Sequence, residues 1–109
     1  MTFKHPIVNE IVVEGAGTTE FNGIYKRDGE RNGFPSFVKR GRWQGGVEKF
    51  VISTQYGRSW HISIPSFGSR YYSSTPTDPK GYQAEDTPPE TGWLTFAGKG
   101  PAPTLSLWL

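Results

Sequence analysis

Apolar and polar residues alternate along short stretches of this chain, and Gly, Pro and Asn residues interrupt them. The clearest alternation runs from residue 60 to residue 64. Trp60, Ile62 and Ile64 share one face of an extended strand, because successive side chains of a strand point to opposite sides. We expect this face to enter the core. His61 and Ser63 take the other face, and we expect His61 to lie toward solvent or at the rim of a sheet.

The same reasoning predicts about seven to eight short strands separated by Gly- and Pro-rich turns. They cover residues 10–14, 21–26, 34–40, 49–54, 60–64, 70–74, 93–97 and 104–108. Asp28-Gly29, Asn32-Gly33 and Tyr56-Gly57 are expected to form turns. Residues 41–46 and 75–90 are expected to form loops. Pro35 has no backbone N–H to donate, so it is expected on an edge strand or at the start of a strand.

No stretch repeats apolar residues at helical spacing over three turns. We therefore predict an all-β fold, a small antiparallel sandwich or barrel of about seven to eight short strands joined as meander-like hairpins. The composition agrees, since 14 Gly, 9 Pro and 15% aromatic residues among 109 are typical of many short strands with tight turns. This length corresponds to a single domain over residues 1–109.

Charge and cysteine content limit the function. The formal net charge is only +2, which makes a dedicated nucleic-acid-binding protein an unfavourable interpretation. The chain has no cysteine, so thiol chemistry and thiolate zinc sites are excluded. The stretch from Ile7 to Val13 is short and interrupted by polar residues, which argues against a secretory signal or a membrane span. We expect a cytoplasmic protein, with a ciliary or organelle-associated location as a variant of that expectation.

The candidate chemical motifs are weak. Gly15-Ala-Gly17 begins like a dinucleotide-binding fingerprint, but a third glycine and a following helix are missing, so we interpret it as a turn that needs positive φ. His5 and His61 have no recognisable metal-ligand or nucleophile partner in the sequence. The clustered carboxylates all fall in expected turns, where they would be solvated; they are Asp28, Glu30, Glu85, Asp86 and Glu90. We predict no catalytic residue, no metal site and no cofactor, and therefore no enzyme.

One segment stands out as a partner-binding candidate. Lys39, Arg40 and Arg42 form the densest positive cluster of the chain, and Trp43 adds a large aromatic surface. Glycines flank this segment, so we expect a protruding loop that steers an acidic partner. The competing interpretation, which we weigh almost equally, is that Trp43 folds back onto the sheet.

Tyr71 and Tyr72 are a second candidate. Adjacent strand residues face opposite sides, so only one of these two tyrosines can enter the core. The other would be exposed or covered by the Pro-rich segment that follows. We include Tyr72 among the candidate partner-binding residues.

An ordered set of motifs covers nearly the whole chain. It comprises Gly15-Ala-Gly17, Asn22-Gly-Ile-Tyr25, Asn32-Gly-Phe-Pro35, Trp60-His-Ile62, Tyr71-Tyr-Ser73, Pro88-Pro-Glu-Thr-Gly-Trp93 and Pro101-Ala-Pro-Thr104. This order resembles a recurring accessory domain of multi-domain proteins of algae and other protists, where it is found beside kinase, ankyrin or ubiquitin-pathway domains. The resemblance implies a eukaryotic, cytosolic binding or scaffold module without known catalytic activity. Here the motifs begin close to Met1 with no neighbouring domain, which favours a small subunit over a tether.

These observations leave three hypotheses. The leading one is a non-catalytic structural or protein-interaction subunit, an accessory component of a larger assembly such as a ciliary or organellar complex. The alternative is a carbohydrate- or ligand-binding β-module that uses exposed aromatic side chains; the sequence does not identify a small-molecule ligand. The second alternative is an RNA-associated accessory protein, which a net charge of +2 supports weakly.

Overall fold

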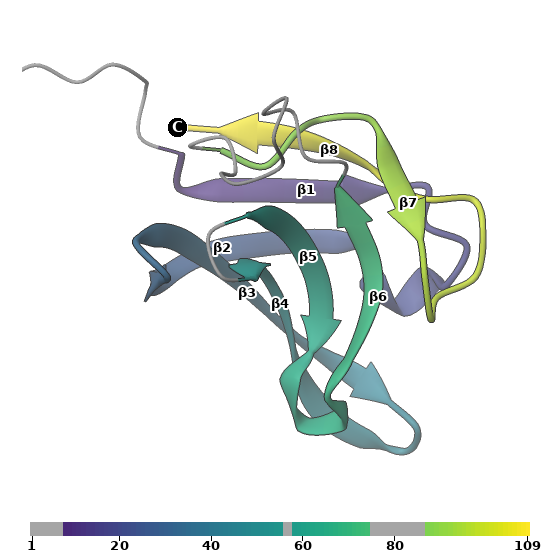
Figure 1. Ribbon diagram of the computed structural model, residues 1–109. Coiled ribbons are helices and arrows are strands. Elements are labelled where there is room, and N and C mark those ends of the chain that lie inside the picture. Colours follow the sequence, from purple (N-terminus) through teal and green to yellow (C-terminus); the bar gives the residue numbers. More distant parts are fainter. Residues whose placement is uncertain (1–7, 56–57, 75–86) are drawn as a thin grey trace, which may run out of the picture.

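The computed structural model describes residues 8–55, 58–74 and 87–109, with Ser69 described by its backbone alone. Antiparallel strands form a single sheet that curls into a nearly closed barrel (Figure 1). The strands are β1 (Glu10–Glu14), β2 (Gly23–Arg31), β3 (Phe34–Trp43), β4 (Gly46–Gln55), β5 (Ser59–Ile64), β6 (Ser69–Ser74), β7 (Trp93–Thr95) and β8 (Thr104–Trp108). Two short 3-10 helices, η1 (Thr19–Phe21) and η2 (Pro65–Phe67), are the only helical segments of the described residues. The all-β prediction is confirmed, and of its two variants the structure adopts the barrel.

The strand order is β7-β6-β5-β4-β3-β2-β1-β8. Strands β1 to β7 follow one another as a meander, as the sequence predicted. β8 departs from it, because it returns across the molecule to pair with β1, from Glu10 opposite Trp108 to Glu14 opposite Thr104. The two sheet edges, β7 and β8, are partly bridged where the Leu105 N–H donates to the Glu90 carbonyl at 2.8 Å.

The predicted and observed strand bounds agree best for the first and last strands of the chain. The predicted strands 10–14 and 104–108 match β1 and β8. The predicted Asp28-Gly29 turn is wrong, because β2 continues through it with an irregular register between Arg27 and Glu30. Asn32-Gly33 does form the hairpin turn, with φ values of 55° and 80°. The Tyr56-Gly57 turn and residues 75–86 of the predicted long loop lie outside the described residues.

The predicted loop at residues 41–46 is also wrong. β3 continues to Trp43 and β4 begins at Gly46, and the turn between them is Gln44-Gly45, with φ values of 49° and 85°. Two positive φ values in succession give the tight two-residue turn that matches the twist of paired strands, so the glycines form a hairpin end and not a loop. Pro35 is the second residue of β3, which lies between β2 and β4, so Pro35 marks a strand start and not an edge strand.

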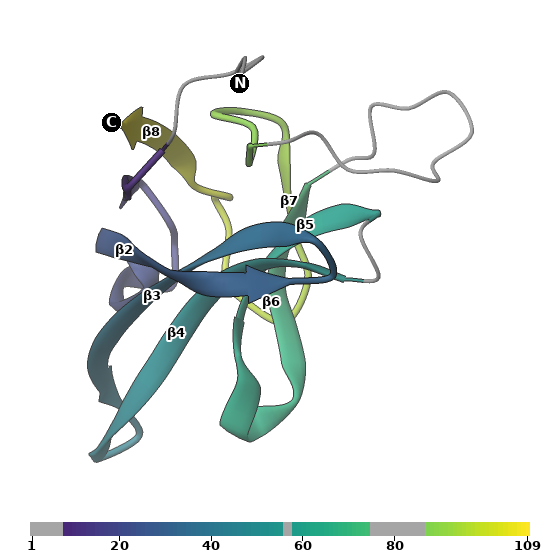
Figure 2. The ribbon, with the colours of Figure 1, turned by 90° about the vertical axis from the view of Figure 1, so that its left-hand side faces the viewer.

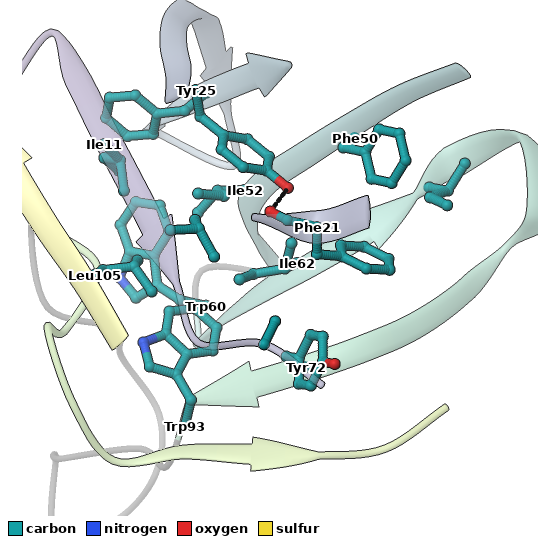
Figure 3. Close-up of a cluster of buried hydrophobic side chains, with 14 of the residues drawn as sticks. Ile11, Phe21, Tyr25, Phe50, Ile52, Trp60, Ile62, Tyr72, Trp93 and Leu105 are labelled. Atoms are coloured by element: carbon teal, nitrogen blue, oxygen red, sulfur yellow. Dashed lines mark hydrogen bonds between the residues drawn. The ribbon is translucent and has the colours of Figure 1, made fainter. Parts of the chain in front are cut away.

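Aromatic and branched aliphatic side chains fill the interior of the barrel (Figure 3). Trp60, Ile62 and Ile64 are each at most 1% exposed, which confirms the predicted phase of β5. The hydroxyl of Tyr25 is also buried, and it donates to the Phe21 carbonyl at 2.7 Å. The remaining core side chains come from every part of the sheet and include Ile11, Val13, Phe37, Phe50, Ile52, Tyr72, Trp93 and Leu105.

Tyr71 and Tyr72 do not take opposite sides of the sheet. Tyr72 enters the core as expected for one of the pair, but the half-buried Tyr71 packs against the same core ring, Phe21. The pairing of β5 with β6 explains this, since Ile62 lies opposite Tyr72 while Ser63 lies opposite Arg70. Tyr71 is therefore the extra residue of a β-bulge, which breaks the alternation of side chains.

The Gly15-Ala-Gly17 motif is a structural turn. Gly15 has a φ of +76°, the positive value that the sequence predicted for this motif. Gly17 is needed for a different reason: a Cβ atom there would lie 2.1 Å from the Gly100 carbonyl oxygen. The side chain of Asn22 accepts a hydrogen bond from the Ala16 N–H at 2.9 Å. Asn22 has a φ of −72°, so Asn22-Gly23 is not the hairpin turn that its sequence suggests.

We predict that Trp60→Ala lowers the free energy of unfolding by about 3–5 kcal/mol, because it empties a fully enclosed position of the core. Urea unfolding followed by circular dichroism measures this. The matched control is Ile24→Ala, because Ile24 is 54% exposed on β2 and its truncation should change stability by less than about 0.5 kcal/mol. Equal effects of the two substitutions would contradict the placement of Trp60 in the core.

Candidate functional site

The positive cluster at residues 39–43 is divided between the two faces of β3. Lys39 points to the barrel side, where its Nζ donates to the Glu20 carbonyl and lies 4.6 Å from the centre of the Phe50 ring. Burial lowers the pKa of the Lys39 ammonium, and the nearby Glu20 carboxylate partly opposes that effect. Arg40 and Arg42 are exposed on the outer face. A protruding patch of three cations is therefore not formed, because alternate residues of a strand point in opposite directions.

Trp43 folds back toward the core. It is half-buried, and its ring makes edge-on contacts with the rings of Phe21, Tyr71 and Phe67 at centroid distances of 5.7, 5.4 and 6.3 Å. Its indole Nε1 is buried and has no hydrogen-bond partner within the part of the chain that the structure describes. Of the two interpretations of Trp43, the structure favours packing onto the sheet.

Tyr72 is not available at the surface. Its side chain is fully buried, and its hydroxyl donates to the Lys99 carbonyl at 2.7 Å and accepts from the Thr18 N–H at 3.1 Å. A Cβ atom at Gly98 would lie 2.7 Å from the Tyr72 ring, so the segment that follows β7 packs directly on this tyrosine. Tyr72 therefore ties that segment to η1 instead of presenting a partner-binding surface.

A groove runs over the outer face of strands β3 to β6. It consists of two adjoining cavities of about 540 and 390 Å³, which share Arg31 and Pro65 as lining residues. Its floor is built from the alternate residues of each strand that do not enter the barrel; these are Ser36, Val38 and Arg40, then Lys49, Val51 and Ser53, then His61 and Ser63, and finally Arg70. The β3–β4 and β5–β6 hairpins project from the same end of the barrel (Figure 2).

A row of polar side chains crosses strands β4 to β6, and two of them, Ser53 and His61, line the smaller cavity. Ser53 of β4 lies opposite His61 of β5, and His61 lies opposite Ser73 of β6. These side chains are only 6%, 6% and 4% exposed, so the predicted solvent exposure of His61 is wrong. The end of the β2–β3 hairpin and the η2 turn line this cavity as well, and they shield the floor between them.

His61 is held in its neutral form. Its Nε2 lies 2.9 Å from the Ser59 hydroxyl, close enough for a hydrogen bond. Burial, together with the positive charge of Arg70, lowers the pKa of His61 to about 4. A serine beside a histidine resembles the nucleophile–base pair of hydrolases, but an imidazole with so low a pKa is a weak acceptor for a serine proton.

Two arginines border the smaller cavity, and neither pairs with a carboxylate of the described residues. No described Asp or Glu carboxylate forms a salt bridge with Arg31 or Arg70, although both side chains line the cavity. The guanidinium of Arg70 instead lies over the Phe96 ring, 4.4 Å from its centre. Phe96 is 47% exposed, so an apolar ring borders this end of the groove beside Arg70.

Sequence reasoning did not find this site. The sequence places His61, Ser63 and Arg70 in strands, but it predicts His61 toward solvent or at a sheet rim and assigns no site to Ser63 or Arg70. One signal was available in the sequence. In a meander, the polar residues that alternate with apolar ones along three successive strands must lie on the same face of the sheet. The cavity walls could not be inferred, because they come from turns that are distant in the chain.

The described residues contain neither a metal-binding cluster nor a membrane-spanning helix. Their His, Asp and Glu side chains form no group of three or more that could hold a metal ion. No helix in this part of the chain is long and apolar enough to cross a membrane. Comparison of the whole chain with protein-family models, curated proteins and solved structures gives no match.

We predict that Trp43→Phe is less destabilising than Trp93→Phe, by about 1 kcal/mol in the free energy of unfolding. Both changes remove the same atoms, but Trp93 Nε1 donates to the Pro89 carbonyl at 2.8 Å whereas Trp43 Nε1 leaves no described partner behind. Parallel urea titrations of the two variants measure the difference. The opposite order would mean that Trp43 Nε1 makes a bond that this structure does not contain.

We also predict a pH dependence specific to His61. The folded chain keeps this imidazole neutral down to pH about 4, whereas the unfolded chain protonates it near pH 6.5. The unfolded state therefore binds more protons between these values, so the contribution of His61 to stability is present above pH 6.5 and is lost as the pH falls toward 4. The difference in unfolding free energy between wild type and His61→Gln should shrink over this range, and a pH-independent difference would contradict the low pKa.

Proposed function

We propose that this domain is a non-catalytic protein-interaction module whose partner binds across the outer groove of strands β3 to β6. The groove is the observation that carries the proposal. Core side chains fill the interior of the barrel, so a partner must bind outside it. The outer face offers two adjoining cavities that together extend across the sheet.

The lining of the groove supports a protein partner. Charged side chains of both signs line the larger cavity, including Arg40, Lys49 and Glu48. Ser53 and Ser63 line the smaller cavity, and the exposed ring of Phe96 lies beside it, against the Arg70 guanidinium. Such a combination of hydrogen-bonding, charged and apolar groups is characteristic of protein interfaces, where apolar anchors provide affinity and charges provide orientation.

The proposal keeps one of the residues that the sequence singled out, Arg40, which lines the larger cavity. Arg42 is exposed further along the same strand but lies outside both cavities and is not part of the proposed surface. Lys39 and Trp43 lie on the barrel side of β3 and support the fold, and Tyr72 belongs to the core. The proposal adds three charged residues that the sequence did not single out. Lys49 lines the larger cavity, Arg70 lines the smaller one, and Arg31 lines both.

The cellular setting is part of the same proposal. We propose a cytoplasmic accessory subunit of a larger assembly, such as a ciliary or organellar complex of a protist. The motif order and its resemblance to accessory domains support this setting, as does the absence of cysteine.

The test places a photo-cross-linking amino acid at Lys49, which is exposed and lines the larger cavity, in cells that express the protein. We expect a covalent adduct with one defined protein, identified by mass spectrometry. With that partner purified, Arg40→Glu should weaken binding by at least about tenfold, because reversing an interfacial charge introduces repulsion.

Two controls decide the outcome. The cross-linker at Thr104, exposed on β8, should not give the same adduct. Arg42→Glu makes the same change of charge on β3 outside both cavities and should weaken binding far less than Arg40→Glu. The same adduct from both positions, or equal effects of the two charge reversals, would rule out the groove as the partner surface.

A further inference from the structure

We infer that the smaller cavity, at the His61 end of the groove, is a binding site for an oxyanion, the phosphate or carboxylate group of a partner side chain. This inference rests on the proposed function, since it names the chemical group that the partner places at this end. Three independent features of the cavity support an oxyanion: the charge of its lining, its hydrogen-bond donors and the contact that positions one arginine.

The charge of the lining is positive. Arg31 and Arg70 are its charged side chains among the described residues, and no described Asp or Glu is part of it. Neither guanidinium forms a salt bridge with a described carboxylate. Two cations at one cavity, with no carboxylate among the described lining residues, produce a local positive potential, and this attracts an anionic group.

The lining also supplies hydrogen-bond donors. Ser53, Ser63 and Gln55 line the cavity together with the two arginines, and their hydroxyl, amide and guanidinium groups are hydrogen-bond donors. The amide of Asn32 is already engaged, since its Nδ2 donates to the Thr54 carbonyl at 3.1 Å and so fixes the cavity wall. Oxyanions accept several hydrogen bonds at once, and bonds from charged donors are the strongest of these.

The guanidinium of Arg70 is held in place before any ligand binds. It lies 4.4 Å from the centre of the Phe96 ring, so the side chain is supported by an aromatic face and not by a competing carboxylate. A donor already held in position loses less conformational freedom when the ligand arrives. Phe96 therefore acts as a positioning residue for Arg70.

His61 lies on the floor of the same cavity and serves as a reporter. The charged groups that face this cavity from the neighbouring elements are Arg31, on the β2–β3 hairpin, and Arg70, on β6. Arg70 contributes to the low pKa of His61. An anion bound beside Arg70 would offset its charge and raise the pKa of His61 above about 4.

The experiment titrates the full chain with inorganic phosphate, and separately with acetate, at constant ionic strength. NMR spectroscopy follows the His61 ring and the arginine side chains. We expect saturable shifts confined to the smaller cavity and a higher His61 pKa at saturation. Binding of phosphate alone assigns the site to a phosphorylated partner, and binding of acetate alone or of both assigns it to carboxylates or to either group.

Variants make the result specific. Arg70→Gln should weaken anion binding about tenfold, as expected for loss of one charged hydrogen-bond donor. Phe96→Leu, which keeps the charge but removes the supporting ring, should weaken it less. Arg42→Gln removes the same charge outside both cavities and should leave binding within about twofold of wild type. Thermal melts establish that each variant is folded, and Arg31→Gln replaces Arg70→Gln if that variant unfolds.

The inference is overturned if neither anion produces saturable shifts at the cavity, or if Arg42→Gln weakens binding as much as the cavity variant does. Such a result would leave the proposed function standing, because cross-linking from Lys49 reports on the larger cavity. Conversely, anion binding without any adduct at Lys49 would retain the oxyanion site and remove the protein partner from the rest of the groove.

Discussion

The barrel depends on the packing of one ring, Phe21, at the point where the chain passes from β1 to β2. This ring is fully buried and contacts aromatic side chains from three different strands. They are Trp43 of β3, Phe50 of β4, and Tyr71 and Tyr72 of β6. A sheet closes only if its distant strands share a common core, and Phe21 gives β6 a common contact with β3 and β4, with which β6 does not pair. The turn before it is equally constrained, because a side chain at Gly17 would collide with the backbone at Gly100.

Because side chains fill the interior of the barrel, its outer surface is where a partner can bind. The core takes one set of alternate residues from each strand, and the other set becomes the floor of the groove. Turns that close the β2–β3 and β5–β6 hairpins border that floor and shield it from water. This shielding is why polar groups such as Ser53 and His61 can be almost completely buried on the outer face. It is also why His61 stays neutral beside Arg70.

The sequence was least informative where strand alternation fails or where turns are shorter than they look. Glycines around Trp43 suggested a loop, but a two-residue turn at Gln44-Gly45 allows both strands to continue. Because these residues lie in a strand, the side chains of Lys39 and its neighbour Arg40 point to opposite faces of the sheet. At Tyr71 a bulge breaks the alternation, and both tyrosines approach Phe21. Local residue preferences predict neither the two-residue turn nor the bulge, because both depend on the register in which neighbouring strands pair.

By itself the sequence determined the fold class, the bounds of β1 and β8, the inward face of Trp60, Ile62 and Ile64, and the Asn32-Gly33 turn. These are local properties, set by the period of side-chain orientation and by the φ values that Asn and Gly tolerate. Only the tertiary structure decided that β8 returns to pair with β1, and that His61 lies buried between two hairpin ends. Such features arise from contacts between residues far apart in the chain, and no local pattern of apolar and polar positions specifies those contacts.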